Sequence, residues 1–232
     1  TLWHTLSLHD ALPISLPLQI DQEVRMLYNE ELKGVFMFVP GTMALILMLL
    51  SAMMTSISIA REKELGTMEV LLVSPLRPTQ IVLGKVTPYI GMAFINAVVI
   101  IALGVFVFDM PVLGSLTLLM AESLLFICMA LSLGILISTK AKSQQVAMFI
   151  SILAFMLPTM LLSGFIFPIK NMPLLLQWIS HIIPAKYYII IIKNIMLKGT
   201  GFWFVWKETL IIAAMMIAFI VASVRMFKVR LE

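Results

Sequence analysis

Long apolar stretches, broken by short polar segments, dominate the sequence. A helix that crosses a bilayer needs about 20 largely apolar residues, because it rises about 1.5 Å per residue through a hydrocarbon core of about 30 Å. Five stretches reach this length: Phe36–Ala60, Val86–Phe108, Ser115–Ser138, Val146–Phe167 and Thr209–Phe227. A further run, Tyr187–Leu197, is interrupted by Lys193 and is too short to cross, so it predicts an interfacial or re-entrant helix. The pattern predicts an all-α, polytopic membrane protein with five transmembrane helices.

Composition narrows the class of protein in the same direction. Hydrophobic residues make up 61% of the 232 residues and charged residues 12%, whereas soluble domains have about 45–50% and about 25%. Too few polar residues remain to cover a soluble core, which excludes a soluble enzyme and a disordered chain. The single cysteine, Cys128, excludes a disulfide-rich secreted domain. The net charge of +4 comes from basic residues scattered between apolar runs, which indicates a lipid membrane and not nucleic acid.

The basic residues predict the orientation of the spans. Segments 61–85, 139–145 and 225–232 hold nine Lys or Arg in about 40 residues, against seven in about 67 on the opposite side. Loops rich in Lys and Arg stay in the cytoplasm. We therefore expect these three segments to be cytoplasmic and residues 109–114 and 168–207 to be external.

The N-terminal residues divide into two parts. Residues 1–20 are expected to be a non-native or disordered leader, because TLWHTLSLHDALPIS resembles translated sequencing-adapter read-through. Residues 21–40 are expected to end an extracytoplasmic segment, and 41–232 to form the membrane domain. Five spans with a cytoplasmic C-terminus place 21–40 outside, which predicts that an earlier span is missing.

Motifs for nucleotide or metal chemistry are absent from the sequence. It contains no G-x-x-x-x-G-K-[ST], no H-E-x-x-H and no G-x-S-x-G. Outside the leader, His181 is the one histidine. We therefore expect no catalytic residue, no metal site and no cofactor in this chain.

The segment Arg61–Lys85 is the most informative polar stretch. Its charged first half continues the preceding helix into water, and Val70–Val73 then makes it amphipathic. Pro75 and Pro78 should end the regular helix, because proline lacks an N–H and clashes with the preceding turn. Such an element can dock into a groove on a cytoplasmic partner. It can equally lie on the lipid headgroups as an interfacial helix.

Arg61–Lys85, which reads REKELGTMEVLLVSPLRPTQIVLGK, resembles the first cytoplasmic loop of ABC-2 type transporter permeases. The motifs Leu162–Pro173 and Leu176–Tyr188 are similar to the external re-entrant region between the last two spans of that family. Tyr28–Lys33 and Val39–Gly41 resemble the end of its external domain and the start of its second span. The resemblance implies the type V exporter-like fold, with a re-entrant external helical hairpin.

The resemblance also implies partners and functional residues. The loop would couple the chain to an ABC ATPase that carries ATP and Mg, and the permease would form a homodimer or heterodimer in the bacterial plasma (inner) membrane. The residues that match the coupling motif are Glu62, Glu64, Gly66, Thr67, Glu69 and Pro75. Those that match the re-entrant external motif are Ser163, Gly164, Pro168, Pro173 and Pro184.

Inside the spans, Glu122 is the unusual residue. A charge at its depth costs about 2.5–3.5 kcal/mol on insertion scales, so such residues usually face a bundle interior or a wet cavity. Two interpretations are open: part of a substrate pathway, with Asn96 as a candidate polar neighbour, or a hydrogen-bonded structural carboxyl. A second pattern, Ala130, Gly134 and Ser138, forms a stripe of small residues that predicts close helix packing within the fold.

Two functions remain open on the sequence. The first is the permease subunit of an ABC-2 exporter, which forms the substrate pathway and couples to a separate ATPase through residues 61–85. The alternative is a non-transporting membrane scaffold or anchor, which needs spans and a docking loop but neither a re-entrant segment nor Glu122.

Overall fold

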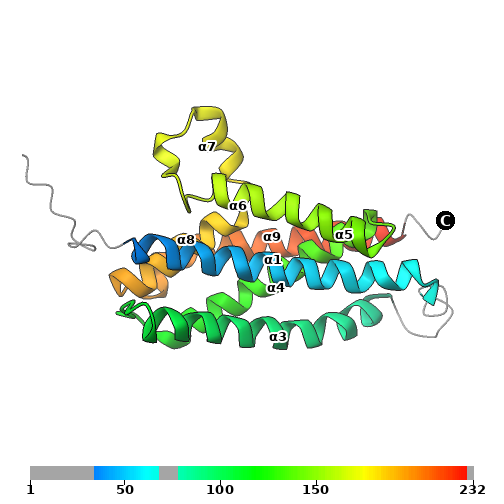
Figure 1. Ribbon diagram of the computed structural model, residues 1–232, viewed down its shortest axis with the longest axis horizontal. Coiled ribbons are helices and arrows are strands. Elements are labelled where there is room, and N and C mark those ends of the chain that lie inside the picture. Colours follow the sequence, from blue (N-terminus) through cyan, green and yellow to red (C-terminus); the bar gives the residue numbers. More distant parts are fainter. Residues whose placement is uncertain (1–33, 68–77, 229–232) are drawn as a thin grey trace, which may run out of the picture. The chain divides into compact units, whose positions relative to one another are not determined.

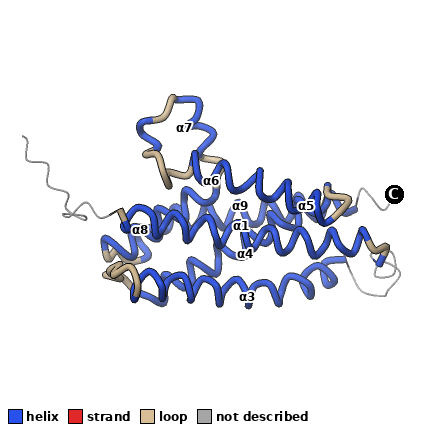
Figure 2. The backbone as a smooth tube through the Cα atoms, in the orientation of Figure 1, coloured by secondary structure: helices blue, strands red, loops and turns tan. Residues whose placement is uncertain are grey.

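The computed structural model describes residues 34–67 and 78–228, and every regular element in these ranges is helical (Figure 2). The predicted all-α fold is therefore confirmed for this part of the chain. Residues 1–33, which include the expected leader and Tyr28–Lys33, lie outside it. In chain order the elements are α1 Val35–Glu64, α3 Pro78–Phe106, α4 Leu116–Lys140, α5 Gln144–Ser151, the π-helix η1 Ile152–Met156, α6 Leu157–Leu162, the 3-10 helix η2 Ile169–Asn171, α7 Leu174–Ser180, α8 Pro184–Lys198 and α9 Phe202–Lys228.

Local sequence signals set several helix ends. Ser115 and Ser143 are the N-caps of α4 and α5, and each hydroxyl accepts a hydrogen bond from the backbone N–H three residues on, at 3.4 Å. Gly199 ends α8 in the left-handed conformation, with φ +64°. Pro78 is the first residue of α3, where its missing N–H removes no hydrogen bond within the helix. The helix end that the sequence predicts at Pro75 lies outside the described residues.

Five helical segments in the described ranges are long and apolar enough to cross a membrane, as predicted: Val35–Glu64, Gly84–Phe106, Leu116–Lys140, Gln144–Leu162 and Phe202–Met226. The last begins seven residues before the predicted Thr209. The aromatic run from Phe202 continues the apolar surface, and the Lys207 ammonium lies 5.9 Å from the centre of the Trp206 ring. The boundary expected at residue 41 falls inside α1, which already begins at Val35.

Helix α1 packs against α3, α4, α5 and α8, and Figure 1 shows it running between α3 and the α5–α6 segment. It lies close against α4 at Gly134, where a Cβ would overlap the carbonyl oxygen of Ala52 and lie 2.9 Å from Thr55 Cβ. Ala130 and Ser138, on the same stripe, are fully buried. The small-residue stripe therefore packs within the fold, as predicted.

The fourth span contains a π-helix, η1, directly before Pro158. Proline has no N–H to donate, and its ring clashes with the carbonyl four residues earlier, here Ala154. A π-helical turn widens the backbone at this point and relieves the clash. The span therefore changes helix type in its middle although its hydrophobic pattern is continuous.

Helix α8 is one of the most buried elements. It packs against α1, α4 and α9, and Tyr188 on it stacks on Phe126 of α4 with ring centres 4.1 Å apart. The sequence left interfacial and re-entrant positions open for this run. The burial excludes a helix that lies on headgroups, and the 81° bend between α7 and α8 fits a re-entrant hairpin.

Candidate functional site

The three segments predicted to be cytoplasmic lie at one end of the helices, which we call the predicted cytoplasmic end. The Lys63 ammonium donates a hydrogen bond to the carbonyl of Ser138, and Glu64 binds Gln144. The Thr139 hydroxyl lies 3.8 Å from the Met226 sulfur near the end of α9. These contacts connect all three segments to one another where they leave the helices. Segments on the same side of a membrane must lie at the same end of the helices, as these do. Which side of the membrane they face stays a prediction.

Helix α1 ends at the start of the predicted coupling loop. Gly66 has a φ of +72°, and its N–H lies 3.3 Å from the carbonyl of Lys63. A residue without a Cβ adopts this left-handed conformation at little cost, which terminates the helix. Gly66 thus ends α1 in a left-handed turn at the start of the loop. Thr67 donates its hydroxyl hydrogen bond to the carbonyl of Glu62 at 3.3 Å.

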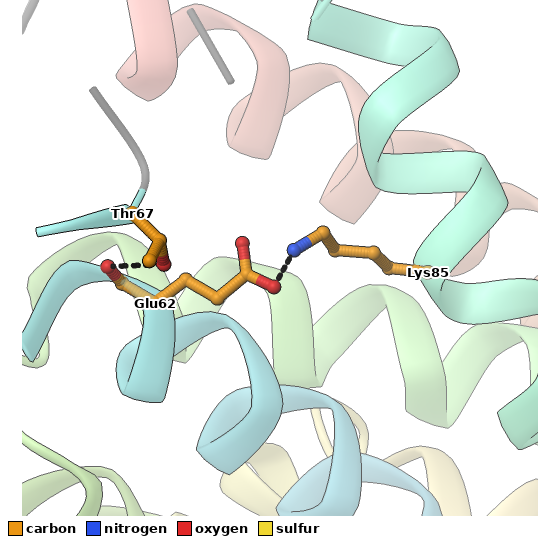
Figure 3. Close-up of polar contacts among 3 residues, drawn as sticks. All are labelled: Glu62, Thr67 and Lys85. Atoms are coloured by element: carbon orange, nitrogen blue, oxygen red, sulfur yellow. Dashed lines mark hydrogen bonds and ion pairs between the residues drawn. The ribbon is translucent and has the colours of Figure 1, made fainter. Parts of the chain in front are cut away.

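The acidic residues of the loop have partners within the chain. Glu62 forms an ion pair with Lys85 at the other end of the loop (Figure 3). Glu64 Oε2 accepts hydrogen bonds from the backbone N and the side-chain Nε2 of Gln144, at 2.9 and 3.2 Å. No sequence pattern indicated either of these two internal contacts. The two remaining loop residues, Glu69 and Pro75, lie outside the described residues.

At the opposite end of the helices, two of the motifs that resemble those of ABC-2 permeases are in contact. The Phe165 ring, which is buried, lies directly against Gly41 of α1, and a Cβ on Gly41 would overlap it. Phe38, one turn earlier, contacts the same ring edge-to-face with centres 5.8 Å apart. Val39–Gly41 and Leu162–Pro173 are about 120 residues apart in the sequence, so this contact links the start of α1 to the start of the re-entrant segment.

The re-entrant segment is punctuated by proline, as predicted. Pro168 precedes η2, Pro173 precedes α7, and Pro184 is the first residue of α8. No continuous helix therefore runs from α5 into α8. At the start of the segment Gly164 has a φ of +80°, and the buried Ser163 hydroxyl donates to the carbonyl of Thr159.

Side chains of α8 fix the bend with α7. The Lys186 ammonium donates to the Ser180 hydroxyl at 3.1 Å, and the Tyr187 hydroxyl donates to the carbonyl of His181 at 2.9 Å. A pocket of about 580 Å³ lies between α6 and residues 167–176. Its lining is mostly apolar, with Asn171 as the one amide side chain. The pocket can accept an apolar group, which no sequence motif indicated.

Glu122 lies in a polar cluster between α4, α8 and α9. Its side chain is 3% exposed, and Oε1 accepts a hydrogen bond from the Thr209 hydroxyl at 2.8 Å. The neighbouring Ser123 hydroxyl lies 2.7 Å from the Tyr188 hydroxyl. Within the described helices the Glu122 carboxyl is hydrogen-bonded to Thr209 and not to Asn96, the candidate polar neighbour that the sequence offered. Thr209 and Tyr188 were missed, because helices far apart in sequence supply them.

The described ranges bring together no group of three or more His, Cys, Asp or Glu residues that could hold a metal ion. Five apolar spans, a broken hairpin at one end and a polar loop base at the other define a multi-pass membrane protein.

Comparison with known proteins identifies the family. The family described as ABC-2 family transporter protein matches residues 7–225, and the chain belongs to it. The match covers the predicted membrane domain as far as residue 225, and it includes every motif that resembles the family. The expected leader at residues 1–20 stays a prediction.

Three relatives from Escherichia coli K12 are similar over most of this chain. The probable multidrug ABC transporter permease YbhR is 37% identical over 185 residues, which are 80% of this chain and 50% of the relative. The probable multidrug ABC transporter permease YbhS is 32% identical over 90% of this chain and 53% of the relative. The inner membrane transport permease YhhJ is 29% identical over 90% and 56%. The chain thus spans about half the length of the curated relatives it matches. No solved structure matches it.

Proposed function

We propose that this chain is the membrane-spanning part of a permease subunit of an ABC exporter. Its family and the names of its relatives, which are ABC transporter permeases, support this assignment. Two permease subunits, identical or different, would form the substrate pathway in a bacterial inner membrane. ATP and Mg would bind a partner ATPase, and this chain would hydrolyse nothing itself.

The observation that carries the proposal is the position of α1. One end of this helix runs into the predicted coupling loop through Gly66, and the other end supports Phe165 of the re-entrant segment. A displacement of the loop would therefore reach the opposite end through one helix of 30 residues. Rigid-body shifts of packed helices are a common route for such switching.

The polar cluster around Glu122 supports a pathway role for this part of the chain. A buried carboxyl with Oε2 unpaired is costly and is rarely kept inside a membrane without function. Asn96 remains a second candidate for the pathway, on α3. The scaffold alternative requires neither the cluster nor the pocket beside α7.

The test is to co-express the chain with a candidate ATP-binding cassette ATPase, and to measure co-purification and efflux. Leu71→Pro should abolish both, because a proline inside the amphipathic helix that the sequence predicts there would cost about 3 kcal/mol. Glu69→Lys should weaken both, because like charges brought together at an interface can cost several kcal/mol. Lys170→Glu, a charge reversal in the external segment, is the matched control and should preserve co-purification. Normal co-purification and efflux with Leu71→Pro would favour the scaffold alternative.

A further inference from the structure

The last three residues of α1 are charged, and each one contacts a different helix. Glu62 pairs with Lys85 of α3, Lys63 donates to the carbonyl of Ser138 on α4, and Glu64 binds Gln144 of α5. Successive residues in a helix point about 100° apart, because there are about 3.6 residues per turn. Three neighbours in sequence therefore reach three sides of α1, which a run of solvated charges would not need to do.

The partners on α4 and α5 are helix ends. Ser138 is among the last four residues of α4. The carbonyls of these residues have no N–H donor within the helix itself. An ammonium group at this position complements the partial negative charge of the helix C-terminus. Gln144 is the first residue of α5, and a carboxylate complements the partial positive charge there. Lys63 and Glu64 thus cap two helices other than their own, each with the sign of charge that this end favours.

The third contact closes the loop at its base. Glu62 and Lys85 are the ends of the segment 62–85, and both side chains are largely shielded, at 26% and 21% exposure. Figure 3 shows the Glu62 carboxylate and the Lys85 ammonium extended toward each other from α1 and α3. The start and the end of the loop are therefore held together, whatever the residues between them contact.

We infer that residues 62–64 form a three-way clamp, which ties the predicted cytoplasmic ends of α3, α4 and α5 to the last turn of α1. These are positioning residues: they make the four helix ends move as one unit when the loop is displaced, and they do not dock the ATPase. The inference rests on the proposed function for its role in transport. The clamp itself is a property of this chain and can be measured without a partner.

The clamp is tested first by distance. Nitroxide labels on Leu65→Cys and Gln145→Cys, both exposed positions, are placed in a background with Cys128→Ser. Electron paramagnetic resonance should give one narrow distribution of the distance between the two labels in the full chain, and Glu64→Ala should broaden this distribution. Lys142→Ala removes an exposed charge from the same region and should leave the distribution narrow. Equal distributions for Glu64→Ala and Lys142→Ala would overturn the clamp.

The role in transport is tested by charge reversal in the complex with the ATPase. Glu62→Lys and Lys85→Glu should each lower the amount of substrate exported per ATP hydrolysed by about tenfold or more. The double variant, which restores the ion pair in reverse, should recover it to within about threefold. Failure of the double variant to recover coupling, with ATPase co-purification lost, would show that these residues dock the partner and would overturn the inference.

The two proposals fail in different ways. If the wild-type chain binds no ATPase, the proposed function fails, while the distance measurement still decides the clamp. If a chain with a single charge reversal does not accumulate in the membrane, export per ATP can still be measured for the double variant and for the conservative Lys85→Met variant. A Lys85→Met variant that exports as much substrate per ATP as the wild type would also overturn the role of the clamp in transport.

Discussion

Substitution of Gly134 by alanine should loosen the packing of α1 on α4. The added methyl carbon would lie 2.9 Å from Thr55 Cβ and would overlap the carbonyl oxygen of Ala52, which is backbone and cannot turn away. The helices must separate, and overpacking of this kind typically costs about 1–3 kcal/mol. Alanine also has a higher helix propensity than glycine, by about 0.8–1.0 kcal/mol, which offsets part of this cost.

The control for this prediction is Gly91→Ala. Gly91 lies inside α3, and a Cβ there would meet no atom within 4 Å. The chemical change and the propensity gain are the same at both sites, so the difference between the two variants isolates the overlap. We expect Gly134→Ala to unfold at a lower temperature than Gly91→Ala, by about 2–4 °C for each kcal/mol. Thermal unfolding in detergent measures this difference. Equal midpoints for the two variants would refute the close α1–α4 contact.

Three further predictions address the rest of the chain. Thr209→Val should lower the free energy of unfolding by about 1–3 kcal/mol, because Glu122 loses its hydrogen-bond donor inside the bundle; an unchanged unfolding curve would contradict the contact. Gly164→Ala should cost about 1–2 kcal/mol, because φ is +80° there, and faster proteolysis within the re-entrant segment is the readout. In intact cells an impermeant thiol reagent should label Asn171→Cys and spare Leu65→Cys, and the reverse pattern would invert the topology.

The fold followed from the sequence because membrane spans have few alternatives. Backbone polar groups must be satisfied inside the bilayer, so a long apolar run is a helix. Proline then located the breaks between α6 and α8. Length and composition could not predict how deeply each helix is buried. The run Tyr187–Leu197 was predicted to be interfacial or re-entrant, and in the structure it lies in α8, packed against α1, α4 and α9.

The candidate site was harder to predict because its contacts join distant segments. Glu62 and Glu64 were identified only as matches to the coupling motif, and the structure pairs them with residues 23 and 80 positions away. Asn96 was chosen for Glu122 by polarity alone, whereas Thr209 on α9 is the residue within reach. Periodicity shows which face of a helix is apolar, but it does not show which helix packs there.

We propose that the loop between α1 and α3 couples this chain to an ATPase. Photo-crosslinking in native membranes tests this most directly, with a benzophenone amino acid placed at Glu69 and, for comparison, at Asn171. We expect a crosslinked product with an ATP-binding cassette ATPase from position 69 and none from position 171. Crosslinks from position 69 to lipid alone, or to the ATPase from position 171 instead, would contradict it.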